Sequence, residues 1–113
     1  MKISKSSAEH YTWGNQCDGW HLLKNDNLSV IHEKMPANTS ERRHYHSKAS
    51  QFFFILSGTA TMELDGQFFI VLPQEGIEVP PLVPHQIFNK TDMDLEFLVI
   101  SQPATRGDRV IVD

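Results

Sequence analysis

Residues 43–58 read RHYHSKASQFFFILSG. His44 and His46 are two positions apart, so on an extended strand both imidazoles point to the same face. Four turn-forming residues follow, and then Gln51 opens an apolar run that stops at Ser57-Gly58. We therefore predict two adjacent strands, the first presenting two imidazoles and the second an amide oxygen.

A further ligand candidate lies downstream, in PPLVPHQIFN at residues 80–89. Prolines fix the backbone before His85, and Asn89 follows four positions later on the same face of a short predicted strand. Imidazole suits zinc, copper, iron and nickel, and an amide oxygen can complete such a set. The sequence thus offers His44, His46, Gln51 and His85 as ligands of one metal ion.

These two segments resemble the motifs of the small single-domain cupins, the RmlC-like family. Its first motif reads Gly, five residues, His-x-His, three or four residues, Glu, six residues, Gly. Its second ends in Pro-x-Gly-x-x-His-x-x-x-Asn. The matching positions here are Asn38, His44, His46, Gln51 and Gly58, then Pro80, Leu82, His85 and Asn89.

Three of those positions depart from the pattern: Asn38 and Leu82 stand for glycines, and Gln51 stands for the glutamate. The resemblance implies an all-β fold, a double-stranded β-helix or jelly-roll barrel. It also implies one divalent metal ion (Zn, Ni, Mn, Fe or Cu) in the barrel mouth. It leaves the reaction open, since similar small cupins include phosphohexose isomerase-like proteins and proteins that open unsaturated uronates.

Composition narrows the class of protein. A chain of 113 residues has room for one domain, and a net charge of -4 with a pI near 5.8 argues against nucleic acid or anionic membrane as partner. Cys17 is the only cysteine, so no intramolecular disulfide can form. Neither a signal peptide nor a membrane span is apparent, and we expect a cytoplasmic protein.

Short β-rich segments with turn signals between them predict an all-β sandwich independently of the resemblance. We expect N-terminal strands packing on the barrel over residues 1–27, the barrel over 28–101 and a tail over 102–113. Within the tail, residues 110–112 could add an edge strand, either to their own sheet or across a dimer. Tyr11, Trp13 and Trp20 are interpreted as anchors of a minor apolar cluster. Alternatively, Trp20 or Tyr11 walls a ligand pocket.

The strand from Gln51 has two unequal faces. Phe53 and Ile55 share the face of Gln51, whereas Phe52, Phe54 and Leu56 form an outer apolar row that needs a cover. That cover is either the N-terminal strands or a second subunit. We expect a homodimer.

The substitution of Gln51 for glutamate bears on the ligand. Three neutral histidines and an amide leave a divalent ion with two positive charges, which favours an anionic small molecule. The other residues expected to line its pocket are Phe53, Ile55, Ile87, Asn89, Arg43 and Trp20.

Two hypotheses follow for function. One is a metal-dependent enzyme, either an isomerase or lyase or a dioxygenase, acting on a sugar acid, keto acid or phosphosugar. The other is a module that binds or senses a small ligand. Possible bases are a metal-bound hydroxide or one of His85, Glu63, Glu78 and Tyr45. The charged residues Glu41, Arg42 and Arg43 are interpreted as part of a solvated loop. Arg106, Asp108 and Arg109 are interpreted as structural or interfacial.

Overall fold

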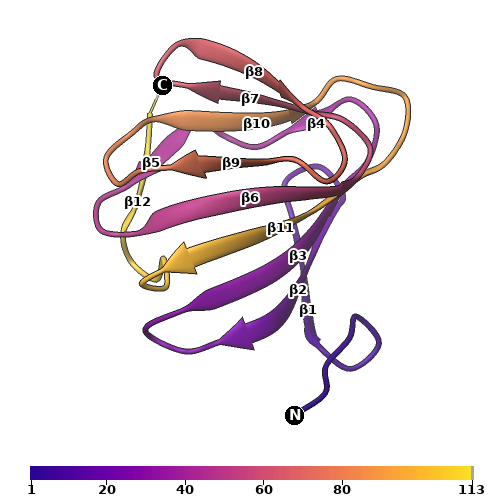
Figure 1. Ribbon diagram of the computed structural model, residues 1–113, viewed down its shortest axis with the longest axis vertical. Coiled ribbons are helices and arrows are strands. Elements are labelled where there is room, and N and C mark those ends of the chain that lie inside the picture. Colours follow the sequence, from indigo (N-terminus) through magenta and orange to yellow (C-terminus); the bar gives the residue numbers. More distant parts are fainter. Residues whose placement is uncertain (113) are drawn as a thin grey trace.

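The computed structural model describes residues 1–112, and this part of the chain contains strands and no helix (Figure 1). It therefore contains no helix that could span a membrane. The strands are β1 (Glu9–Trp13), β2 (Cys17–Lys24), β3 (Ser29–Met35), β4 (Thr39–Ser40), β5 (His44–His46), β6 (Ser50–Ser57), β7 (Ala60–Leu64), β8 (Gln67–Val71), β9 (Gly76–Val79), β10 (His85–Asn89), β11 (Leu95–Gln102) and β12 (Arg109–Ile111).

Two antiparallel sheets face each other. Sheet I has the order β1-β2-β3-β11-β6-β9, and sheet II has the order β12-β5-β10-β7-β8 with β4 beside β10. From β8 onward the chain crosses between the sheets at each successive strand, which winds it into a double-stranded β-helix. The predicted all-β jelly-roll fold is confirmed.

The sequence of β6 explains how this strand lies in the barrel. Gln51, Phe53 and Ile55 are buried between the sheets, while Phe52 between them is 40% exposed. The alternation predicted from the sequence is therefore confirmed, and it continues on β11. A hairpin forms at Asp65-Gly66, the dipeptide typical of a tight β-turn, and both residues have positive φ, 49° and 89°.

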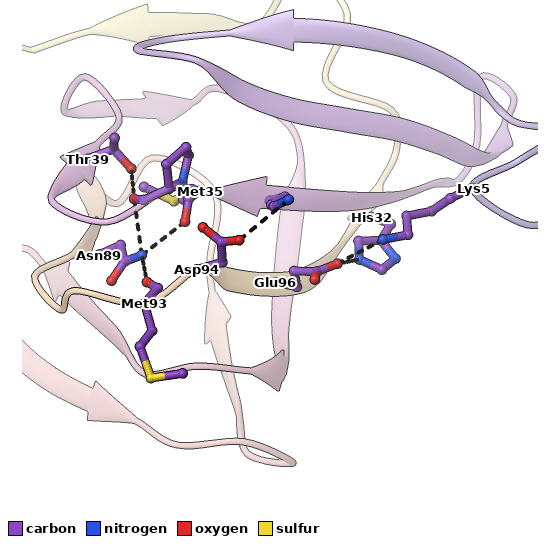
Figure 2. A network of polar contacts seen from close by, with 10 residues as sticks. Lys5, His32, Met35, Thr39, Asn89, Met93, Asp94 and Glu96 are labelled. Atoms are coloured by element: carbon purple, nitrogen blue, oxygen red, sulfur yellow. Dashed lines mark hydrogen bonds and ion pairs between the residues drawn. The ribbon is translucent and has the colours of Figure 1, made fainter.

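The N-terminal strands do not cover the outer face of β6. Instead, β1 and β2 extend sheet I beyond β3, at the end away from β6 (Figure 1). The segment before β1 is tied to sheet I by Lys5, whose Nζ lies 3.1 Å from Glu96 Oε1 (Figure 2). The same Nζ lies 4.8 Å from the ring centre of Trp20. The expectation that the N-terminal strands cover Phe52 is therefore wrong.

The C-terminal strand β12 pairs antiparallel with β5 of the same chain, with Arg109 opposite His46 and Ile111 opposite His44. The tail thus adds an edge strand to its own sheet II, one of the two arrangements expected. This pairing brings the loop before β12 against the strand that carries the His-x-His motif.

Candidate metal centre

Three histidines from sheet II converge on one point inside the barrel. His44 and His46 lie on one face of β5, and His85 opens β10 directly opposite His44. All three side chains are buried, and their ligand nitrogens lie within 4.8 Å of one another. The convergence predicted from the H-x-H spacing and the downstream histidine is therefore present.

Each histidine uses Nδ1 to hold its ring. His44 Nδ1 donates to the carbonyl of Arg42 at 2.8 Å, and His85 Nδ1 donates to the carbonyl of Val83 at 3.0 Å. His46 Nδ1 donates to Asp108 Oδ1 at 2.9 Å. Because carbonyl and carboxylate oxygens only accept, these bonds place the proton on Nδ1 and leave every Nε2 lone pair free for a metal ion.

Gln51 reaches the same space from sheet I. Its Nε2 donates to Ser101 Oγ at 3.0 Å, which fixes the amide with Oε1 turned away from Ser101. Oε1 is buried and makes no hydrogen bond within residues 1–112, and the same holds for His85 Nε2. Buried polar atoms normally find partners, so two such atoms at one site are available as donors to a ligand. Three imidazole nitrogens and one amide oxygen fit a divalent metal ion.

Burial keeps the histidines neutral. Removal from water lowers the pKa of His44 to about 3 and that of His85 to about 4, despite the hydrogen bonds each Nδ1 donates. Neutral imidazole is the form that binds metal, so no proton has to leave either ring at neutral pH.

Two of the three histidines, His44 and His46, line a cavity of about 180 Å³ between the two sheets. Gln51 and Phe53 line it from β6, and Arg109 lines it from β12. The remaining lining residues are Tyr11, Trp13, Ile31, Glu33, Glu41, Val99, Ser101 and Thr105. A small ligand in this cavity would contact both the histidine group and Arg109.

Two carboxyl groups in the cavity wall have raised pKa values. Burial raises the pKa of Glu33 to about 7, even though Tyr11 Oη donates to its Oε2 at 2.8 Å. Burial, with a contribution from Glu33, raises the pKa of Glu41 to about 8. Glu41 Oε2 accepts from the backbone N–H of Ile87 at 3.0 Å. The expectation of a solvated loop at 41–43 is wrong for Glu41.

Of the six further pocket residues predicted from the sequence, Phe53 alone lines the cavity. Ile55 and Ile87 are fully buried in the hydrophobic core between the sheets. Arg43 forms a two-pronged ion pair with Glu63, at 2.8 and 3.1 Å, outside the cavity lining. The hydrogen bonds from the Arg43 guanidinium lower the pKa of Glu63. Arg43 and Glu63 therefore bind each other rather than a ligand in the cavity.

Asn89 has a structural role. Its Nδ2 donates to the carbonyl oxygens of Met35, Pro36 and Met93, at 2.9, 3.1 and 2.7 Å (Figure 2). Its Oδ1 accepts from Thr91. The amide thereby closes the loop between β10 and β11 rather than facing a ligand.

Trp20 also lies outside the cavity lining. Its ring packs between those of His10 and His32, with centroids 5.2 and 5.6 Å away. Tyr11, the other aromatic considered as a pocket wall, does line the cavity. Of the other base candidates, Glu78 is exposed on β9, and Tyr45 alternates away from the two histidines beside it.

The sequence interpretation missed Glu33, Glu41, Asp108 and Arg109. Only Glu33 carried a usable signal, because it falls between Ile31 and Met35 in the alternation of β3 and so faces inward with them. Glu41 is held by the backbone N–H of Ile87 on β10, 46 positions away, and Asp108 and Arg109 are placed by the pairing of β12 with β5.

The comparisons with known proteins agree with this geometry. Residues 31–101 match the family described as Cupin domain. The chain belongs to the cupin family. The uncharacterized protein MJ1618 of Methanocaldococcus jannaschii is 29% identical over 83 residues, which cover 74% of this chain and 66% of that protein. The match thus spans just under two thirds of this relative.

Solved cupin structures superimpose closely. A predicted oxalate decarboxylase from Thermotoga maritima has a TM-score of 0.84 at 21% identity, covering 92% of this chain and 100% of that one. A sugar phosphate isomerase of a cupin superfamily from Silicibacter pomeroyi has a TM-score of 0.76 at 20% identity, covering 92% and 76%. At such identities the likeness shows the shared fold.

Proposed function

We propose that this cupin is a metal-dependent protein that binds a small, oxygen-rich anion such as a sugar acid, a keto acid or a phosphosugar. The observation that carries the proposal is the pair of buried atoms without partners, His85 Nε2 and Gln51 Oε1. They complete a donor set with His44 and His46 in which every ligand is neutral.

The charge of the site supports an anionic ligand. A divalent ion held by neutral donors keeps both positive charges and would polarise a carboxylate or carbonyl oxygen as a Lewis acid. Arg109 adds a guanidinium to the same cavity, and a guanidinium fork matches a carboxylate or phosphate. Two solved relatives are named for oxalate and a sugar phosphate, both oxygen-rich anions.

Among the reactions considered, the residues of the cavity favour isomerase or lyase chemistry. Glu33 and Glu41 place two carboxyl groups with pKa values near neutrality in the same wall. Groups that gain and lose protons near pH 7 suit proton transfer, which isomerisation and elimination require. A dioxygenase or a binding module without turnover would not need them.

The test is metal analysis of the purified protein, followed by titration of galacturonate and pyruvate with and without metal. Bound Zn, Ni, Mn, Fe or Cu, lost in His44→Ala together with anion binding, is the expected result. Oxygen consumption with iron or copper would instead favour the dioxygenase. Anion binding that survives His44→Ala without metal would replace the proposal with a metal-free binding module.

The proposal includes a homodimer in the cytoplasm. Phe52 is 40% exposed on the outer face of β6, and Phe68 and Ile70 on the edge strand β8 are 59% and 63% exposed. Apolar surface of this kind on a small barrel suits an interface with a second copy. A buried free thiol at Cys17 is compatible with a reducing compartment. Sedimentation analysis of the wild type and of Phe68→Lys would test the dimer.

A further inference from the structure

Glu33 faces the histidine group from the opposite sheet. It lies on β3 in sheet I, whereas His44 and His46 lie on β5 in sheet II, and all three line the same cavity. A small molecule that filled this cavity would lie between the histidines and the Glu33 carboxyl group. Such a placement on two walls is what a metal ion and an acid-base group need in order to act on one substrate.

The Glu33 carboxyl group is held by a cross-strand arrangement in sheet I. Gly19 on β2 stands opposite Tyr11 on β1 and opposite Glu33 on β3. The Tyr11 ring occupies the space in which a Cβ of residue 19 would lie, so glycine is required there. Tyr11 passes over Gly19, and its Oη donates to Glu33 Oε2 at 2.8 Å.

This arrangement leaves one carboxyl oxygen for a ligand. Oε2 is occupied by Tyr11, and Oε1 makes no hydrogen bond within residues 1–112. Unlike His85 Nε2 and Gln51 Oε1, it is not among the fully buried atoms that lack partners. It is therefore the oxygen that a molecule in the cavity can reach.

We propose that Glu33 is the catalytic residue that takes a proton from the bound substrate and returns it, through Oε1, and that Tyr11 is a positioning residue. This inference rests on the proposed function and narrows it to proton transfer at a carbon next to a carbonyl group. Its substrate class is a sugar acid or keto acid with such a C–H bond.

The step balances within the site. Glu33 as carboxylate removes the proton from the carbon, and the C–H electron pair forms the carbon–carbon double bond of an enolate. The carbonyl π electrons pass to the oxygen, where positive charge in the cavity stabilises them. Glu33, now a carboxylic acid, returns the proton to the same carbon. Where that carbon carries a hydroxyl group, as in a sugar acid, the hydroxyl proton passes to the enolate oxygen and the hydroxyl oxygen becomes the new carbonyl. Glu33 then gives its proton to the former carbonyl carbon, and an isomer forms. The step requires no oxidant or reductant.

The pKa of Glu33, raised by burial to about 7, agrees with that role. A base acts best when its pKa lies near the working pH. The charged and titratable groups that face it are Tyr11 from β1, Cys17 from β2, Glu41 from the loop before β5, and Arg109 from β12. Its neighbours His44 and His46 in the cavity come from β5.

The direct test is proton exchange with solvent. Metal-loaded protein is incubated in D₂O with pyruvate or galacturonate, and loss of the proton next to the carbonyl group is followed by NMR. We expect Glu33→Gln to slow this exchange by roughly 100-fold or more, with metal content and anion affinity unchanged. Glu78→Gln, the same change on the exposed face of β9, should leave the rate as in the wild type.

The role of Tyr11 is tested by the pH profile. Its hydrogen bond lowers the pKa of Glu33, so Tyr11→Phe should move the rising limb of the exchange rate to higher pH. Gly19→Ala, which forces the Tyr11 ring aside, should move it in the same direction. Tyr45→Phe, the same change on the far face of β5, should not. If Tyr11→Phe lowered the exchange rate equally at every pH and did not shift the pH profile, Tyr11 would have only a packing role.

Failure of this inference can be told apart from failure of the proposed function. Metal and anion binding with no exchange, or with equal exchange in Glu33→Gln, would overturn the assignment of Glu33 and leave the proposed function intact. If no metal binds, infrared difference spectra of the protein alone still decide. A neutral carboxyl band that titrates near pH 7 in the wild type must be missing in Glu33→Gln, and equal spectra would overturn the inference.

Discussion

Asp108 Oδ1 lies 2.9 Å from His46 Nδ1, although the two residues are 62 positions apart in the chain. The other carboxylate oxygen accepts from the backbone N–H groups of Lys48 and Ala49 at 3.2 and 3.0 Å. Burial alone would raise the pKa of Asp108, but these hydrogen bonds lower it. One ionised side chain before β12 thus orients a histidine of the candidate metal centre and the turn that follows it.

Asp108→Asn is therefore expected to weaken metal binding roughly 10- to 100-fold, the usual effect of losing a carboxylate behind a histidine ligand. The amide keeps the size of the side chain and can still accept from His46. Its NH₂ group, however, cannot accept from the two backbone amides. Competition with a chromophoric chelator measures the affinity. Asp92→Asn, an exposed change of the same kind, is the control, and equal affinities in the two variants would contradict the prediction.

Gln51→Glu is expected to tighten metal binding on the order of tenfold or more, because a negative ligand replaces a neutral one beside a divalent ion. Ser101 Oγ, 3.0 Å from Gln51 Nε2, can turn its hydroxyl to donate to the new carboxylate. The lost positive charge should weaken binding of galacturonate or pyruvate. Calorimetry measures both affinities, with the exposed neighbour Gln102→Glu as control. Unchanged anion affinity would argue against direct charge attraction by the ion.

The metal-free protein should be most stable between about pH 4.5 and 6.5. The pKa of His44 and of His85 is lowered from 6.5 to about 3 and 4, so the unfolded chain binds more protons and stability falls as pH drops. The pKa of Glu33 and of Glu41 is raised from 4.5 to about 7 and 8, so stability falls as pH rises through these values. Between 4.5 and 6.5 the two effects cancel.

Each group contributes a slope of up to about 1.4 kcal/mol per pH unit in its own window. Urea denaturation at a series of pH values measures the curve. The double variant Glu33→Gln, Glu41→Gln should lose the decline between pH 6.5 and 8, and its stability should fall on acidification from about pH 6.5, because no glutamate then offsets His44 and His85. If the stability of this variant still declined above pH 6.5, that decline would have to come from other titrating groups.

The fold and the histidine group could be predicted because they depend on local patterns. The H-x-H spacing places two rings on one face of a strand, and the alternation from Gln51 to Leu56 assigns the two faces of β6. His85 follows from the proline-rich segment before it. These features need no knowledge of which loop packs on which strand.

The rest of the site depends on contacts that no local pattern specifies. Asn89 shares its face of β10 with His85, yet it lies at the far end of the strand and closes a loop there. Asp108 reaches His46 because β12 pairs with β5, and nothing in the sequence near either residue indicates that pairing. The Tyr11–Glu33 contact likewise requires that β1 and β2 extend sheet I.

Leu82 departs from the cupin motif, and its backbone conformation is strained as a result. It occupies a glycine position of the second motif, and its φ is 69°, in the left-handed region that disfavours a residue with a Cβ. Its side chain is 63% exposed, and its backbone N–H donates to the carbonyl of His46 at 2.8 Å. Little packing therefore offsets the backbone strain.

Leu82→Gly should raise the free energy of unfolding by about 1 kcal/mol, because the strain relieved exceeds the entropy that glycine adds to the unfolded chain. Asn38→Gly, at the other substituted glycine position with φ 59°, should gain less, since asparagine adopts this region more readily. Urea denaturation of both variants tests this order. A loss of stability in Leu82→Gly would show that the Leu82 side chain makes contacts, such as those of a second subunit, that outweigh its backbone strain.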